Sequence, residues 1–168
     1  MTDTPPVASA RQRRVLALDM ATSTGWALHV PGRPVTSGTQ RFDLSRGETN
    51  GMRFLRFARW LRELGADLGP GDVIAFERAH HRGGPATEVG VGLMAHMMSV
   101  AAERGCETLP IHTATLKKHA TGAGNAGKDL MVAAADKRWG RRPETDDEAD
   151  ALCVLAWALE TCGVEDGW

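Results

Sequence analysis

The stretch Val15-Leu16-Ala17-Leu18-Asp19 decides how this chain begins to fold. Four apolar residues in a row, followed by an acid, predict a short buried strand. A second strand is predicted from Thr24 to Val30 after a tight turn, and a third from Val35 to Phe42. The stretch Val73-Ile74-Ala75-Phe76-Glu77 repeats the first pattern. The chain is therefore expected to open as an antiparallel meander and to contain two buried strands that each end in a carboxylate.

Helices and strands are expected to alternate after this meander. Apolar residues recur with helical spacing in residues 51–65. Further elements are predicted as helices at residues 87–104, 115–120, 128–139 and 146–162, and as one more strand at residues 108–111. This order predicts an α/β domain with a mixed five-stranded sheet, three antiparallel strands and then parallel ones, flanked by helices. We expect one domain at residues 14–162, between a flexible tail at residues 1–13 and a short tail at residues 163–168.

The composition is ordinary for a soluble globular protein, with 42% apolar and 24% charged residues in a chain of 168. No apolar stretch is long enough to span a bilayer, and residues 1–14 contain no apolar segment typical of a secretory signal. The three cysteines, Cys106, Cys153 and Cys162, lack metal-ligand spacing, so we expect reduced and buried thiols. These features predict a cytoplasmic protein with no membrane partner.

The charge pattern leaves nucleic-acid binding open. The formal net charge is −1, which does not by itself indicate a nucleic-acid partner. Basic residues are nevertheless clustered, at Lys117-Lys118 and in the series Arg53, Arg56, Arg59 and Arg62. A near-neutral total can conceal a basic face opposite an acidic site, although each cluster alone is also typical of a solvated helix face.

The segment Asp147-Glu148-Ala149-Asp150 places two carboxylates three residues apart near the start of a predicted helix. Positions i and i+3 share a helix face, so Asp147 and Asp150 are expected to point the same way. A divalent cation between them would relieve their repulsion. Acids in the first turn also favour the positive end of the helix dipole, and Thr145 or Asp146 is a candidate N-cap. Both metal binding and capping are consistent with this segment alone.

The two strand-end acids favour metal binding. Ligands of α/β sheets gather at the carboxyl ends of strands, which is where Asp19 and Glu77 are expected. Either acid alone could simply face water, but with Asp147 and Asp150 they form a set of four carboxylates. Hard oxygen ligands without a His or Cys pattern favour Mg²⁺ or Mn²⁺ over zinc. Carboxylate-held metal pairs suit phosphoryl transfer by in-line displacement.

Several stretches, taken in order, resemble the RuvC family of Holliday-junction resolvases. The acid-containing ones are Leu18–Ala27, Ala75–Glu77 and Asp147–Leu152. The segment Leu116–Lys128 resembles the lysine-containing segment of that family, with a second lysine eleven residues after the first. Gly90–Leu93 lies where the family has a glycine-containing helix after its second acid. The resemblance covers nearly the whole chain.

This resemblance implies an RNase H-like fold and a homodimer that cuts a four-way DNA junction, or other branched DNA, symmetrically. It implies Mg²⁺ in each subunit, with two ions per active site and Mn²⁺ as a substitute. The implied metal ligands and catalytic acids are Asp19, Glu77, Asp147 and Asp150. Lys117 and Lys128 are implied to contact phosphate or stabilise charge near the scissile bond, so Lys128 is also a candidate catalytic residue. The remaining expected DNA contacts are Lys118, His80, His81 and Arg82.

The same pattern assigns the neighbouring acids. Because Asp147 pairs with Asp150, Asp146 and Glu148 are expected to be the cap and a solvent-facing residue. The chain also departs from the family, since Met20 and Ala21 stand where Pro and Gly are common. Residue His80 replaces an aromatic residue that stacks on bases. We favour DNA contact over metal binding for His80 and its neighbour, because neither has a spaced histidine partner.

The departures leave the strictness for Holliday junctions open. The shortened first motif, which contains Trp26, resembles the phage-encoded branch of the family. Two other interpretations are consistent with parts of the sequence. Residues 19–25 also resemble the first phosphate loop of sugar kinases and actin-like ATPases, but those proteins use two such domains and the sequence contains no second phosphate loop. A non-catalytic DNA-binding relative is the other alternative, although all four acids are present.

Overall fold

The structure, a computed structural model, describes residues 12–78 and 83–165. Five strands form one mixed sheet in the order β3-β2-β1-β4-β5. The strands are β1 (Val15–Asp19), β2 (Ser23–His29), β3 (Thr36–Arg41), β4 (Val73–Glu77) and β5 (Glu107–Ile111). The first three strands pair antiparallel, and β4 and β5 run parallel to β1. This confirms the expected meander followed by parallel strands.

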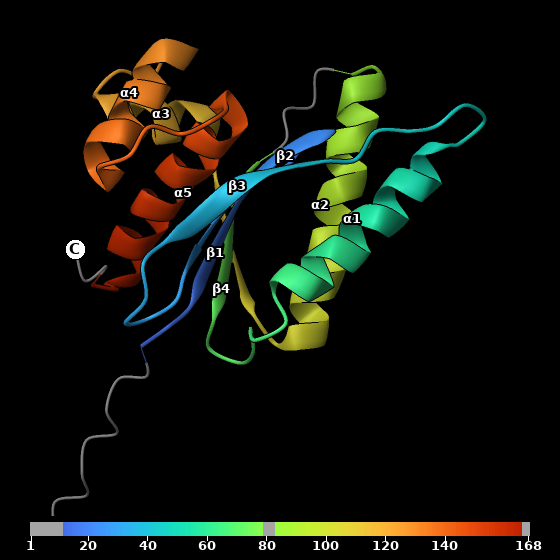
Figure 1. Ribbon diagram of the computed structural model, residues 1–168, viewed down its shortest axis with the longest axis horizontal. Coiled ribbons are helices and arrows are strands. Elements are labelled where there is room, and N and C mark those ends of the chain that lie inside the picture. Colours follow the sequence, from blue (N-terminus) through green and yellow to red (C-terminus); the bar gives the residue numbers. More distant parts are fainter. Residues whose placement is uncertain (1–11, 79–82, 166–168) are drawn as a thin grey trace, which may run out of the picture.

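The helices cover both faces of the sheet (Figure 1). They are α1 (Asn50–Leu64), α2 (Pro85–Arg104), α3 (Thr113–Thr121), α4 (Lys128–Trp139) and α5 (Asp146–Cys162). The pair α1 and α2 lies on one face, and α5 lies on the other, with α3 and α4 packed against it. The predicted start of α2 at Thr87 was two residues late, because Pro85 occupies the first turn, where its fixed φ suits a helix.

Strand alternation divides the core into two halves. In β1, Val15 and Ala17 pack towards α5, whereas Leu16 and Leu18 pack towards α1 and α2. The parallel neighbour β4 alternates in the same way, with Val73 and Ala75 on the α5 side. Successive side chains of a strand point to opposite faces. The last residue of each strand, Asp19 or Glu77, therefore belongs to the α5 side of the sheet.

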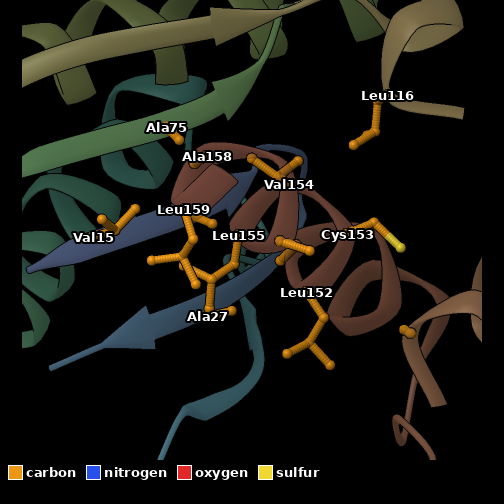
Figure 2. Packing of buried hydrophobic residues seen from close by; sticks show 14 of the residues in the cluster. Val15, Ala27, Ala75, Leu116, Leu152, Cys153, Val154, Leu155, Ala158 and Leu159 are labelled. Atoms are coloured by element: carbon orange, nitrogen blue, oxygen red, sulfur yellow. The ribbon is translucent and has the colours of Figure 1, made fainter. Parts of the chain in front are cut away.

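Helix α5 is almost entirely apolar beyond its first turn because it is covered by the sheet and by the α3–α4 pair. Figure 2 shows Leu155 and Leu159 lying near Ala27 and Val15 of the sheet. On the α4 side, Trp139 is buried and its indole Nε1–H donates to the carbonyl of Leu152 at 3.2 Å. These contacts fix α5, and with it the acids in its first turns.

Helices α1 and α2 approach closely where α2 has a glycine. A Cβ added at Gly92 would lie 2.2 Å from Cζ of Phe54, which is shorter than any real contact. A side chain at this position would require the Phe54 ring of α1 to move, because the ring occupies that space. Among the described residues, no helix is long and apolar enough to cross a membrane.

Candidate active site

The carboxyl ends of β1 and β4 bring two acids side by side. Leu18 pairs with Phe76 in the parallel register, so the next residues, Asp19 and Glu77, are neighbours at the same sheet edge. Both belong to the α5 side by strand alternation. Asp19 is also the register partner of Gly25 on β2. The sheet thus presents a carboxylate pair under the start of α5, as expected for a ligand site of an α/β sheet.

The start of α5 supplies the other two acids. Thr145 is the N-cap, and its hydroxyl accepts a hydrogen bond from the backbone N–H of Glu148 at 3.0 Å. Asp147 follows in the first turn, and its Oδ2 accepts a hydrogen bond from the Ser23 hydroxyl at 2.6 Å. Asp150 lies three residues further, on the same face as Asp147. The local pattern therefore places both acids as the i, i+3 spacing predicts.

Gly25 allows this helix start to touch the sheet. A Cβ at residue 25 would lie 1.8 Å from the carbonyl oxygen of Asp147 and 2.3 Å from its carbonyl carbon. No side chain fits in that space, so α5 can descend onto β2 only because residue 25 is glycine. Gly25 pairs with Asp19 of β1, so the contact places the backbone of Asp147 beside the Asp19–Gly25 pair.

A cleft of about 240 Å³ opens above these acids. Its polar lining consists of the carboxylates Asp19, Glu77 and Asp150, the lysines Lys117 and Lys128, and Thr113. Leu116 and Met131 complete the lining. Asp147 does not line the cleft, but it is close enough for its charge to act on Asp19 and Asp150. Lys118 is exposed on α3 and does not line the cleft, so its DNA contact stays a prediction.

The acids act on one another electrostatically. Burial raises the pKa of Asp19 well above its ordinary value, and three neighbouring negative charges raise it further. Those charges belong to Asp150, Glu77 and Asp147, whereas the ammonium of Lys128 lowers this pKa. Burial raises the pKa of Asp150 to about 6, again with help from Glu77 and Asp147. Bringing these carboxylates together is costly when all are ionised and no cation is present.

The donor chemistry suits a hard divalent cation, although the side chains do not form a ready-made cage. Within residues 12–78 and 83–165, no three or more Asp, Glu, His or Cys side chains are grouped so that they could hold a metal ion. Two of the acids instead accept hydroxyl hydrogen bonds, Glu77 from Thr113 and Asp147 from Ser23. All four acids offer carboxylate oxygens, the ligands that Mg²⁺ and Mn²⁺ prefer.

Lys128 is tied to the acidic cluster from the first residue of α4. Its Nζ lies 3.3 Å from Oδ2 of Asp146, which is the first residue of α5. The hydrogen bond and charge of Asp146 raise the pKa of Lys128, with smaller contributions from Asp147 and Asp150. The lysine side chain is 79% exposed, so its ammonium is accessible to a ligand at the cleft.

Two expectations about α5 were wrong. The cap is Thr145 and not Asp146, because a threonine hydroxyl in extended backbone can accept from the N–H three residues on. Glu148 does not face solvent: it is 2% exposed. The sequence contained a usable signal, since Thr145-x-x-Glu148 has the spacing of a capping box. In this helix the Glu148 carboxylate accepts from the N–H of Glu144, one residue before the cap.

The structure does not test the remaining predicted DNA contacts. His80, His81 and Arg82 lie outside the described residues. In the arginine series of α1, two of the four members pair with acids, Arg56 with Glu48 and Arg62 with Glu103. The cationic residues that line the cleft are Lys117 and Lys128.

Comparison with known proteins gives a likeness in structure. No protein-family profile matches the sequence, and no curated protein does. A structure of Thermus thermophilus RuvC matches with a TM-score of 0.69 and 20% identity, covering 90% of this chain and 97% of that one. The T. thermophilus RuvC in complex with Holliday junction substrate matches with a TM-score of 0.73 and the same identity and coverage. Neither supports the narrower phage-encoded type, but together they confirm the fold: the chain has the mixed-sheet, RNase H-like fold of RuvC.

Proposed function

We propose that this chain is a Mg²⁺-dependent endonuclease that resolves Holliday junctions and related branched DNA. The observation that carries the proposal is a cleft in which Asp19, Glu77 and Asp150, from two strand ends and one helix start, lie beside two lysines, while the charge of Asp147 acts on Asp19 and Asp150. The shared fold supports it, because one of the matching RuvC structures holds a Holliday junction substrate.

Each residue has a proposed part. Asp19, Glu77, Asp147 and Asp150 would hold two Mg²⁺ ions, or Mn²⁺ in their place, and relief of their mutual repulsion would favour binding. Bound ions of this kind activate water and stabilise the leaving oxygen in phosphodiester hydrolysis. Lys117 and Lys128 would attract the DNA phosphate at the cleft and offset charge that develops on it.

The proposed enzyme is a homodimer, since symmetric cutting of a junction requires two equivalent sites. Two copies with one site each would cut two strands of like polarity across the junction. Lys118, His80, His81 and Arg82 remain proposed contacts to the DNA around the cut.

Nicking of a synthetic four-way junction in Mg²⁺ tests the proposal. Wild type should cut the junction and leave a linear duplex of the same sequence intact, and Asp147→Asn should bind the junction without cutting it. The matched control is Asp67→Asn, which removes an exposed acid outside the site. Equal cutting by wild type and Asp147→Asn would refute the proposed metal site. Equal cutting of duplex and junction would refute the junction preference and leave a less selective nuclease.

A further inference from the structure

Glu148 lies between two proposed metal ligands but faces away from their cleft. Its carboxylate is buried and does not line the cleft that contains Asp19 and Asp150. A buried carboxylate is costly unless it is fully hydrogen-bonded. Its partners therefore indicate what the side chain does for the fold.

The Glu148 carboxylate is satisfied on both oxygens. Oε1 accepts a hydrogen bond from the Ser37 hydroxyl of β3 at 2.6 Å, and from Nη1 of Arg141 at 3.1 Å. Oε2 accepts from the backbone N–H of Glu144 at 2.8 Å. Arg141 also donates to the Ser37 hydroxyl, so the three side chains form a closed network. One carboxylate thus links α5, the loop before it and an edge strand.

Two more hydroxyl contacts run parallel to this network. The hydroxyls of Thr39 on β3 and Thr145 at the N-cap are hydrogen-bonded to each other. Ser23 on β2 donates to Asp147. Strands β2 and β3 therefore hydrogen-bond to residues 145, 147 and 148 of the helix start, and of these three residues Glu148 is the buried one. The backbone of Asp147 is meanwhile pressed against Gly25, so the helix start has little freedom to move towards the sheet.

We infer that Glu148 is a positioning residue for the proposed metal site: with Ser37 and Arg141, it fixes the rotation of the first turn of α5 so that Asp147 and Asp150 face Asp19 and Glu77. The inference rests on the proposed function. Residues 147 and 150 flank Glu148 on one rigid turn, so rotating the turn moves both carboxylates relative to the sheet. Outer-shell partners that orient metal ligands typically change metal affinity or activity by about 10- to 100-fold.

The test measures cutting of a labelled four-way junction against Mg²⁺ concentration, and Mn²⁺ binding by calorimetry. Glu148→Gln should raise the Mg²⁺ concentration for half-maximal cutting, and the Mn²⁺ dissociation constant, by about tenfold. Junction affinity measured in Ca²⁺ should be unchanged, and saturating Mg²⁺ should restore the wild-type cutting rate. Ser37→Ala should shift both midpoints in the same direction by about threefold, since it removes only one of the hydrogen bonds that the Glu148 carboxylate accepts. Ser99→Ala, which removes an exposed hydroxyl from α2, is the matched control.

The outcomes separate the two proposals. Unchanged metal midpoints in folded Glu148→Gln and Ser37→Ala, with Asp147→Asn inactive, would overturn the positioning role and leave the nuclease intact. Wild type that binds Mn²⁺ but cuts no DNA would refute the proposed function, while weaker Mn²⁺ binding by the variants would still support positioning. If Glu148→Gln does not fold, Ser37→Ala decides. A uniform fall in cutting that high Mg²⁺ does not restore would indicate a purely structural role and would also overturn the inference.

Discussion

The two faces of the sheet use the same strands for different purposes. On the α1–α2 side, Leu18 and Phe76 are buried in a core that also contains Phe57. One residue further along, on the α5 side, Asp19 and Glu77 line the cleft. Both faces contribute to stability through apolar burial, but at the α5 side the strand ends also bring carboxylate charges together, which lowers stability. Adjacent residues in one strand should separate cleanly into those that hold the fold and those that perform chemistry.

The largest expected effect is on cutting. Asp19→Asn removes a proposed metal ligand, and we expect junction cutting to fall by at least about a thousandfold, equivalent to about 4 kcal/mol. The free energy of unfolding should not fall, because the substitution also removes the buried charge of Asp19. Gel-based nicking and urea unfolding of the same preparation measure both quantities. Cutting within tenfold of wild type would contradict the division between the faces.

The reverse result is expected one residue earlier. Leu18→Ala leaves a cavity in the α1–α2 half of the core and should lower the free energy of unfolding by about 2–5 kcal/mol. Cutting per folded molecule should stay within about twofold of wild type, since the residue faces away from the cleft. A specific loss of metal-dependent cutting, measured at low temperature where the variant is folded, would show that the two faces are coupled.

Asp150 gives a pH-dependent contrast. Its folded-state pKa of about 6 lies above the ordinary value of 3.8, so the group stabilises the fold below pH 4 and this contribution is lost as pH rises through 6. Without divalent cations, Asp150→Asn should be about 1–2 kcal/mol more stable than wild type at pH 7, after allowance for solvent screening. The two should be equally stable at pH 3.5. Thermal unfolding across this pH range, in EDTA, checks the sign, and a less stable variant at pH 7 would contradict it.

The two helix caps offer a smaller and matched comparison. Thr145 caps α5 with its side chain, whereas Thr49 at the same position of α1 makes no side-chain cap hydrogen bond. Thr145→Ala should lower the free energy of unfolding by about 1 kcal/mol. Thr49→Ala should change it by less than half as much. Equal losses in denaturant titrations would mean that the hydroxyl bond at α5 contributes nothing.

The smallest effect is expected on the outer surface of the α1–α2 layer. Arg62 and Glu103 form a bidentate pair between the two helices, and both side chains are about half exposed. A double-mutant cycle with Arg62→Met and Glu103→Gln should give a coupling energy below about 1 kcal/mol that declines with added salt. A salt-independent coupling well above that value would assign this face an electrostatic role.

The sequence predicted the fold and the position of the strand-end acids well because both depend on local patterns. Four apolar residues followed by an acid identify β1 and β4, and strand alternation then places Asp19 and Glu77 on one face. The i, i+3 spacing of Asp147 and Asp150 is equally local. These features need no knowledge of which elements meet in space.

Glu148 shows what local sequence patterns do not predict. Its main anchor is Ser37, which is 111 residues away in the chain and reaches it only through the pairing of β3 with β2 and the packing of α5 on the sheet. The pairing of Asp147 with Asp150 and the family pattern predicted that this glutamate faces solvent, because neither indicates the distant hydroxyl that it contacts. The capping-box spacing with Thr145 indicated a local role, but not burial.

Gly25 also constrains how this protein can be changed. The sheet and helix α5, which carries two of the acids, are in close backbone contact at Gly25, so neither part can be exchanged by itself. A chimera that takes residues 145–163 from another protein of this fold would need a residue without a side chain at position 25 to seat the new helix. Swapping both parts together should preserve activity more often than swapping either one. The contact at Gly25 thus requires two stretches that are distant in the sequence to be exchanged together.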